Sequence, residues 1–447
     1  MYFNIKSSLL AMFFLKHSSF TILFLAISDS LVGGSGLAKP MTKKSKSEKK
    51  CSKKSSKKKN DGDIIYLSPG QSIQDALDGA GDGATIHLSP GDYTEEGNVL
   101  YGLRVSHNNV RLVGATCGEE AVATRILPSG KQQVGVYAAP DECEYQATEC
   151  DSELFDFAIK GIVVEGFPKN GIQTRFVDGF QFIDSQSISN LNNGLYPTLS
   201  KNGSIEGCTS VGSLDAGLWV AGSRDIDVLH NDVSDSVTGI EITVSRDVRV
   251  SNNDVYDNCV GIGYYHANMA GTRPDFPPYS NVVFENNHVY DNNRRNDAPE
   301  GSFQSALPSG VGVLLVGVRG ETVRNNRIED NQFVGFGMAG FCTVQTLFFG
   351  VDCIVDPPID GDPSANFNQI VDNTFSGNGD IGFPGPPPLE GADIIYIQSK
   401  DEFIPSGKSN ENCFRDNVTP DGEPATYIAT DFDPPGNLIP LPTGGCS

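Results

Sequence analysis

The most regular feature of the sequence is a Gly followed by an aliphatic residue, which recurs at a nearly constant interval. Successive occurrences between residues 171 and 262 are 23, 23, 22 and 22 residues apart. Between them lie short runs that alternate aliphatic and polar residues, such as 226–230 and 239–244, separated by Asn, Asp, Ser and Gly. Such runs are typical of short strands, and a fixed period of this length indicates a repeat architecture. The pairs are Gly171-Ile172, Gly194-Leu195, Gly217-Leu218, Gly239-Ile240 and Gly261-Ile262.

A repeat of about 22–23 residues with two or three short strands predicts an all-β protein built as a coiled parallel sheet. Each coil of such a solenoid buries its inward aliphatic residues against the coils above and below. We therefore expect one inward ladder of Leu195, Leu218, Ile240 and Ile262. The consensus of leucine-rich repeats is missing and helical spacing is absent between residues 150 and 340, which excludes leucine-rich and helical solenoids.

An Asn follows the first strand in many repeats. Asn tolerates the left-handed backbone conformation and hydrogen-bonds locally at tight corners. We therefore expect a structural role for these residues at the corners of the coils, rather than a catalytic one. They are Asn231, Asn253, Asn287, Asn326 and Asn373.

The chain divides into four parts. Residues 1–38 combine Lys6 with interrupted apolar runs and small residues near the end, which favours a secretory signal peptide over a membrane anchor. Residues 39–60 form a Lys- and Ser-rich stretch without aliphatic residues beyond position 42, which predicts a disordered tether able to adhere to an anionic surface. Residues 61–400 are the predicted solenoid, and residues 401–447 a C-terminal cap or tail.

Charge and cysteine content point to an extracellular protein. The formal net charge is −23, and 13 Lys lie before residue 60, so the body is strongly acidic and nucleic-acid binding by it is excluded. The chain has ten Cys and no CxxC motif, so we expect the Cys residues to form disulfide bonds rather than to bind zinc. We expect a secreted monomer, either free or associated with the cell wall, without a membrane span in the mature chain. The sequence identifies no cofactor, and its acidic body is compatible with calcium binding. The disulfide candidates are Cys143, Cys150, Cys342 and Cys353, and the glycosylation candidates are Asn202 and Asn417.

The beginning of the predicted solenoid has the pattern of a helix and a strand. Ser72 is a plausible helix N-cap, Ile73, Ala76 and Leu77 lie on one face, and Gly79 to Gly83 ends the helix. Such a helix would cover the open end of the first coil. This segment, followed by "ATIHLSPGDY", resembles the opening of right-handed parallel β-helix proteins of the pectate-lyase-like superfamily.

Later segments resemble, in order and spacing, a family of secreted β-helix-repeat proteins known mainly from bacteria. They include "NNGLYPTLSKNGSIEGC", "DAGLWVAGSRDIDV", "TGIEITVSRDVRV" and "VGIGYYH". The resemblance covers residues 62–380 and implies a right-handed parallel β-helix with a loose tie to carbohydrates. The family's FDLP segment is "YYHA" in this chain, so His266 stands where the family has Asp.

One row of outward side chains is expected to form the functional surface. Since side chains alternate across a strand, the residue two after each marker Gly faces outward if the intervening residue faces inward. That row contains the only Trp of the chain, and aromatic rings and carboxylates are typical of carbohydrate sites. The alternative is that Trp219 packs beneath an inserted loop. The row is Gln173, Tyr196, Trp219 and Glu241, flanked by Arg175, Tyr265 and Asp215.

Two insertions, residues 266–280 and 292–310, interrupt the repeat after Gly261. Loops that project from one side of a solenoid commonly build its binding face. We therefore expect His266 and Arg273 to border the outward row, in a groove suited to a neutral or uronate-bearing polysaccharide.

Three functions are compatible with these residues. A polysaccharide lyase or C5-epimerase would use His266 as base or acid, Tyr265 as donor and Arg175 or Arg273 to neutralise a uronate. A glycoside hydrolase would use the carboxyl pair Glu241 and Asp215. A non-catalytic cell-wall, matrix or mineral-binding protein needs no acid–base pair and accounts for the Lys-rich tether.

Overall fold

A computed structural model describes residues 62–96, 98–115, 123–265, 281–344, 364–382, 389–398, 411–431 and 437–446. The predicted signal peptide and the Lys-rich tether lie outside these residues, as do His266, Arg273 and Cys353.

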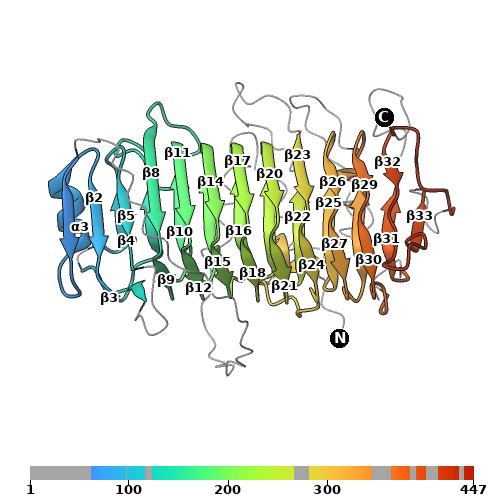
Figure 1. The fold of residues 1–447 in the computed structure, drawn as a ribbon, viewed down its shortest axis with the longest axis horizontal. Helices are drawn as coiled ribbons and strands as arrows, with labels where there is room; N and C mark the ends of the chain where they lie inside the picture. The colour runs from blue at the N-terminus through green and yellow to red at the C-terminus, as the bar shows by residue number, and fades with distance from the viewer. Residues whose placement is uncertain are drawn as a thin grey trace, which may run out of the picture.

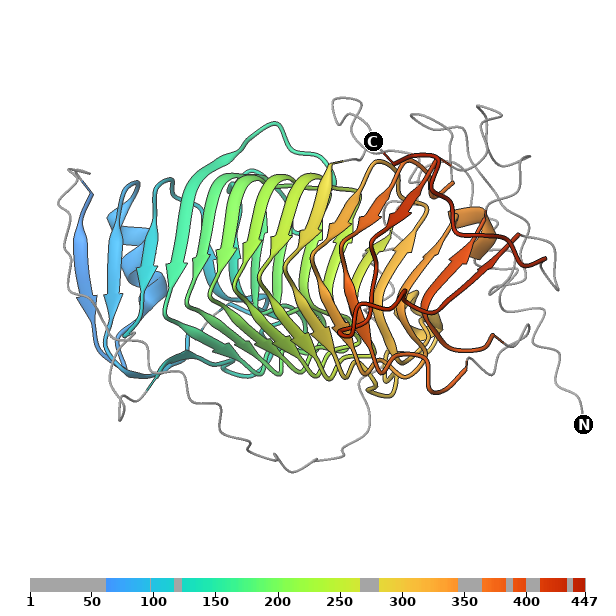
Figure 2. The ribbon, with the colours of Figure 1, turned by 45° about the vertical axis from the view of Figure 1, so that its right-hand side comes forward.

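The described chain forms a right-handed parallel β-helix, as the repeat predicted (Figure 1). Each complete coil contributes one short strand to each of three parallel sheets, and neighbouring strands in a sheet come from successive coils. Figure 2 shows the coils stacked along one axis. The parallel pairing follows from the sequence because every repeat presents its strands in the same order.

Within each of the three sheets, the strands lie side by side in chain order. The 12-stranded sheet contains β1 (Ile64–Leu67), β2 (Thr85–Leu88), β5 (Arg111–Val113), β8 (Leu154–Lys160), β11 (Val177–Ile183), β14 (Lys201–Glu206), β17 (Arg224–Leu229), β20 (Arg246–Ser251), β23 (Val282–Glu285), β26 (Thr322–Arg324), β29 (Gln369–Val371) and β32 (Cys413–Arg415). The 10-stranded sheet contains β3 (Gly91–Tyr93), β6 (Thr124–Ile126), β9 (Val163–Glu165), β12 (Gln186–Ile188), β15 (Thr209–Val211), β18 (Asp232–Ser234), β21 (Asp254–Tyr256), β24 (His288–Tyr290), β27 (Arg327–Glu329) and β30 (Thr374–Ser376). The 11-stranded sheet contains β4 (Tyr101–Val105), β7 (Val134–Ala138), β10 (Ile172–Arg175), β13 (Leu195–Thr198), β16 (Ala216–Ala221), β19 (Thr238–Thr243), β22 (Val260–Tyr265), β25 (Val311–Val316), β28 (Val334–Ala339), β31 (Ala392–Ile397) and β33 (Tyr427–Thr430).

The predicted inward ladder is confirmed. Leu195, Leu218, Ile240 and Ile262 pair in register across adjacent strands of the 11-stranded sheet, and each is fully buried in the core. Burying an aliphatic side chain of this size stabilises the fold by about 1.5 to 3 kcal/mol. The marker Gly residues precede this ladder because a side chain there would collide with the next coil: a Cβ on Gly239 would lie 2.6 Å from the carbonyl oxygen of Gly261.

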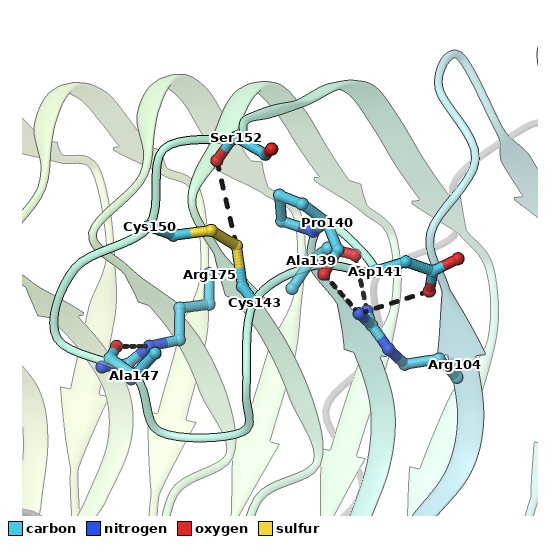
Figure 3. The surroundings of a disulfide bond; sticks show 9 residues. All are labelled: Arg104, Ala139, Pro140, Asp141, Cys143, Ala147, Cys150, Ser152 and Arg175. Atoms are coloured by element: carbon cyan, nitrogen blue, oxygen red, sulfur yellow. Dashed lines mark hydrogen bonds and ion pairs between the residues drawn. A yellow bond between two sulfur atoms is a disulfide. The ribbon is translucent and has the colours of Figure 1, made fainter.

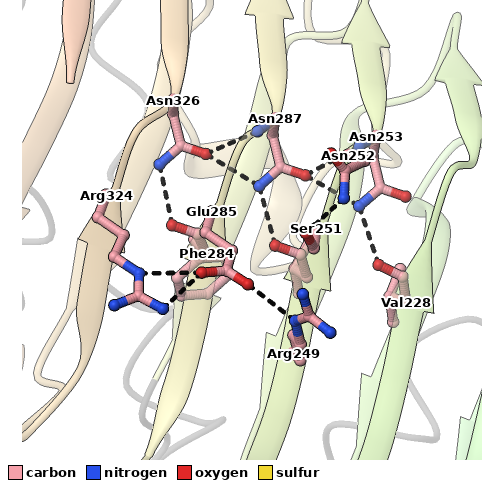
Figure 4. A network of polar contacts seen from close by, with 11 residues as sticks. Val228, Arg249, Ser251, Asn252, Asn253, Phe284, Glu285, Asn287, Arg324 and Asn326 are labelled. Atoms are coloured by element: carbon pink, nitrogen blue, oxygen red, sulfur yellow. Dashed lines mark hydrogen bonds and ion pairs between the residues drawn. The ribbon is translucent and has the colours of Figure 1, made fainter. Parts of the chain in front are cut away.

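The Asn residues form a second ladder, at a corner of the coils (Figure 4). The backbone N–H and the side-chain amide of Asn253 both donate to Oδ1 of Asn287, at 3.1 and 2.9 Å, and Asn287 donates in the same way to Asn326. The structural role is confirmed, but the expected left-handed conformation is not: it belongs to the preceding residue, such as Asn252 with φ 56°. The ladder satisfies buried backbone groups that the sheets leave unpaired where the chain turns.

The N-terminal end contains the helix α3 (Ile73–Ala80), where the sequence indicated one. Ser72 is its N-cap and accepts a hydrogen bond from the backbone N–H of Asp75, and Ile73 and Leu77 are buried. The function of this helix as a cover for the first coil remains a prediction. Among the described residues, no helix is both long and apolar enough to cross a membrane.

The C-terminal part differs from the prediction in one respect. The solenoid does not end near residue 400, because β32 and β33 extend the 12-stranded and 11-stranded sheets. Disulfides join Cys413 to Cys446 and Cys143 to Cys150, and the second of these pairs is as predicted. Cys342 is also disulfide-bonded, and its predicted pairing with Cys353 involves a residue outside the described part of the chain.

The two glycosylation candidates differ in their surroundings. Asn202 is exposed on β14 and remains a prediction. Asn417 is a member of the Asn ladder: its amide donates to the carbonyl oxygen of Ile370, and its Oδ1 accepts from Asn373. A glycan on that amide would break the ladder, so the structure does not favour Asn417 as an acceptor.

Candidate active site

The outward row predicted from the repeat is present on the 11-stranded sheet. Gln173 pairs with Tyr196, Trp219 with Glu241, and Glu241 with Gly263, so these positions lie side by side on successive coils. A second row two residues further on pairs Arg175 with Thr198 and Thr243 with Tyr265. The contiguity of the row is therefore confirmed.

The row is not an exposed aromatic surface, and that expectation was wrong. Tyr196 and Trp219 are only 2% and 6% exposed. Their rings stack on each other with centroids 4.6 Å apart and planes inclined by 7°, and the Trp219 indole N–H donates to Oγ1 of Thr243 at 2.7 Å. Because the rings turn their faces toward each other along the solenoid axis, those faces cannot both stack on a sugar.

Two inserted loops lie over the row. The loop between β7 and β8 reaches Arg175, whose Nε donates to the carbonyl oxygen of Ala147 at 2.6 Å. The loop between β24 and β25 contains the short 3-10 helix η2 (Gln304–Ala306), and its Phe303 packs edge-on against Tyr265 with ring centroids 5.3 Å apart. The alternative that the aromatic residues lie beneath loops therefore describes the structure better than an open stripe.

A cluster of buried polar groups lies beside the aromatic pair, formed by Asp215, Glu241 and Tyr265. Oδ1 of Asp215, Oε2 of Glu241 and the Tyr265 hydroxyl are all buried without a hydrogen-bond partner within the described part of the chain. Buried polar atoms are nearly always hydrogen-bonded, and unsatisfied ones are common at functional sites. These three side chains were all predicted as catalytic candidates, and the structure brings them together.

The ionisation of the two carboxyl groups is strongly perturbed. Burial raises the pKa of Asp215 to about 7, and a hydrogen bond from Asn193 opposes this effect. Burial also raises the pKa of Glu241 well above its usual range, and the neighbouring Asp215 raises it further. A hydrogen bond from Gln304 lowers that pKa by less. At neutral pH the cluster therefore combines a protonated acid with a carboxyl group that ionises near pH 7, which is the arrangement that acid–base catalysis requires.

Tyr265 reaches this cluster because the row contains Gly263. A Cβ on Gly263 would lie 2.3 Å from the Tyr265 hydroxyl oxygen, so the phenol ring occupies the space that any other side chain would fill. Burial raises the pKa of Tyr265 well above its usual range, and Glu241 adds to the effect, so its hydroxyl stays protonated.

Arg175 lies apart from the acidic cluster. Its electrostatic neighbours are Tyr196, Tyr137 and Tyr145, whereas Glu241 lies three strands further along the sheet, about 14 Å at the usual strand spacing. Arg175 therefore cannot neutralise a group bound at the acidic cluster. Gln173 is also buried, and its side chain accepts a hydrogen bond from Asn170 at 2.9 Å.

Sequence reasoning missed Tyr137, which continues the outward row on β7 and pairs with Gln173. The signal was present, because Gly135-Val136-Tyr137 repeats the Gly-aliphatic-outward pattern one coil before Gly171. Gln304 was also missed, since nothing in an irregular insertion predicts which side chain turns toward the sheet.

The described ranges contain no cluster suited to a metal ion. In that part of the chain, no three His, Cys, Asp or Glu side chains are grouped as metal ligands.

Comparisons with known proteins agree with the fold. The family described as right handed beta helix region matches residues 158–273, about a quarter of the chain. The A-module of mannuronan C-5 epimerase AlgE4 from Azotobacter vinelandii superposes with a TM-score of 0.53 and 15% identity, covering 83% of this chain and 93% of that module. The A-module of AlgE6 from the same organism gives 0.53 and 16%, covering 83% and 92%. A search of curated protein sequences finds no match. At these identities the likeness establishes the fold alone.

Proposed function

We propose that the protein acts on an extracellular polysaccharide by acid–base chemistry at the cluster of Asp215, Glu241 and Tyr265. The observation that carries the proposal is the concentration of unpartnered, buried polar atoms there, in two carboxyl groups and one phenol. The names of the superposed modules support the substrate class, since both are mannuronan C-5 epimerases on a β-helix of this form.

In this proposal Glu241 is the acid and Asp215 the base. Glu241 is the more strongly perturbed carboxyl group and keeps its proton, which it gives to the glycosidic oxygen that leaves. Asp215 ionises near neutral pH and takes a proton, either from an attacking water or from C5 of a uronate. The Tyr265 hydroxyl donates a hydrogen bond to the oxygen that gains charge. Proton removal from water, with cleavage of the glycosidic bond, gives hydrolysis, and proton removal from C5, with departure of the C4 oxygen, gives elimination. Epimerisation leaves the glycosidic bond intact, and the proton of Glu241 then goes instead to C5, on the face opposite to Asp215.

The test is a turnover screen of the secreted full-length chain against neutral and uronate-containing polysaccharides. New reducing ends without unsaturated products indicate hydrolysis, ultraviolet-absorbing unsaturated ends indicate elimination, and inversion at C5 in the proton NMR spectrum indicates epimerisation. Glu241→Gln and Asp215→Asn should each lower turnover by about 100-fold or more. Asp227→Asn, at an exposed aspartate on β17, should leave it unchanged.

A second candidate is a non-catalytic polysaccharide-binding protein. The observation that favours it is the near-complete burial of the site, in which Glu241 is 1% and Tyr265 4% exposed. Polysaccharide binding that survives Glu241→Gln and Asp215→Asn, with no turnover of any polymer, would replace the enzymatic proposal with this one.

Secretion and adhesion of the Lys-rich segment to an anionic wall polymer or surface are part of the proposal. The two disulfides between described residues support an oxidising compartment.

A further inference from the structure

Arg175 is buried beneath the loop between β7 and β8, and one of its nitrogen atoms has no partner within the described ranges. Its Nε donates to the carbonyl oxygen of Ala147 at 2.6 Å, and its Nη2 donates to that of Gln146 at 3.2 Å. Nη1 is buried and lacks a hydrogen-bond partner among the described residues. Figure 3 shows the guanidinium pointing toward the loop that the Cys143–Cys150 disulfide braces.

A second arginine in contact with the same loop offers a direct comparison. Arg104 donates to the carbonyl oxygens of Ala139 and Pro140 at 2.6 and 2.7 Å, and it also pairs with the carboxylate of Asp141 at 3.7 Å (Figure 3). Arg175 is 1% exposed, and its electrostatic neighbours within the described ranges are tyrosines, with no carboxylate. A buried guanidinium without an anion is unfavourable, because its charge is removed from water and not paired.

Tyr137 adds a second unsatisfied donor to the same place. Its ring stacks on Tyr101 with centroids 4.9 Å apart and meets Tyr145 edge-on at 5.4 Å, so the phenol is held rigidly. Its hydroxyl is buried without a partner among the described residues, and the residue is fully buried. Burial raises the pKa of Tyr137, so the hydroxyl keeps its proton and can donate it in a hydrogen bond.

We propose that Arg175 and Tyr137 form a subsite for an anionic group of the polysaccharide, either a carboxylate or a sulfate ester. The guanidinium supplies the positive charge and one free N–H, and the phenol supplies an O–H donor. The subsite lies three strands from Glu241 in the 11-stranded sheet, so a polysaccharide chain that occupies both places must run parallel to the solenoid axis. This inference rests on the proposed function for the polymer, and it narrows that polymer to an acidic polysaccharide.

The experiment measures binding rather than turnover, by isothermal titration calorimetry with the full-length chain carrying Glu241→Gln. The probes are hexagalacturonate, a sulfated galactose hexamer and the neutral galactose hexamer. At least one anionic probe should bind about tenfold or more tightly than the neutral probe, since hydrogen bonds to a charged group are worth that much. Arg175→Met should abolish the preference, and Tyr137→Phe should weaken it several-fold.

Arg104→Met is the matched control, because Arg104 also holds the loop through carbonyl oxygens and lies over the Tyr137 ring, 5.0 Å from its centroid, but already has Asp141 as its partner. It should keep the preference for the anionic probe. The proposal would be overturned if neutral and anionic probes bound equally well, or if no probe bound. It would also be overturned if Arg175→Met and Arg104→Met lost the preference for the anionic probe to the same extent. Thermal unfolding of each variant shows whether it folds. If Arg175→Met does not fold, the binding of the anionic probes to Tyr137→Phe tests the proposal, because this variant preserves the ring stack. Because the assay needs no catalysis, anion-dependent binding without turnover would refute the acid–base proposal and leave this one standing.

Discussion

Replacing Asp215 by Asn should stabilise the protein at alkaline pH. Burial raises the pKa of Asp215 from 3.8 to about 7, so the folded state binds a proton that the unfolded state has already released. Because the pKa of Asp215 is higher in the folded state, its favourable contribution to the free energy of unfolding is fully present below about pH 4. That contribution is lost as the pH rises through about 7. A difference of about 3 pKa units at about 1.4 kcal/mol each gives about 4 kcal/mol, as an upper limit because part of Asp215 keeps contact with solvent.

The assay is urea unfolding, followed by far-ultraviolet circular dichroism between pH 4 and pH 8.5. Asn has nearly the same shape as Asp and no charge, so Asp215→Asn should be more stable than the wild type at pH 8, with a difference that shrinks toward pH 4. Asp227→Asn, on the exposed side of β17, should follow the wild-type curve. If Asp215→Asn were less stable than the wild type at pH 8, the ionised carboxylate would have to be favourably paired in the folded state, contrary to this prediction.

Three further predictions concern the pH dependence of turnover, Gly263 and the Asn ladder. Turnover should rise as the pH increases through about 7, where Asp215 becomes a base, and Asp215→Asn should remove that limb of the profile. Gly263→Ala should displace Tyr265, because the new Cβ would lie 2.3 Å from its hydroxyl oxygen, and should lower turnover at least tenfold with an unchanged circular dichroism spectrum; full activity would contradict this. Asn287→Ala removes the acceptor of two Asn253 donors and should cost about 2 to 4 kcal/mol in urea unfolding, whereas a cost below 0.5 kcal/mol, about that of a neutral surface substitution, would show that water replaces the ladder.

The fold was predictable because its signal is periodic. The spacing of the Gly-aliphatic pairs set the length of a coil, and the alternation after each Gly set which residues turn inward, so the ladder through Leu218 and Ile240 followed from sequence alone. The proximity of Glu241 and Tyr265 was also predictable, because the register places them on the neighbouring strands β19 and β22. Asp215 precedes β16, and the register alone does not set its distance from Glu241.

The parts that sequence did not predict depend on irregular segments. Loops have no period, so the sequence left open whether Trp219 would be exposed or buried, and it did not indicate that Phe303 would pack on Tyr265. The role expected for Arg175 was wrong for a different reason: the row itself places Arg175 three strands from Glu241, and the expectation did not take that separation into account. The left-handed conformation was expected at the ladder Asn residues but is found one position earlier, as at Asn252. The sequence shows two successive polar residues at each corner, and it does not indicate which of the two adopts that conformation.

The proposed function requires a saccharide to bind in contact with Asp215, Glu241 and Tyr265. The most direct test is a crystal structure of the full-length Glu241→Gln variant with a bound oligomer of the polysaccharide that the turnover or binding screen selects. We expect a glycosidic oxygen within hydrogen-bond distance of residue 241 and of the Tyr265 hydroxyl, with Asp215 facing the same sugar residue. Ordered water alone between these three side chains, with the oligomer bound on another face of the solenoid, would contradict it.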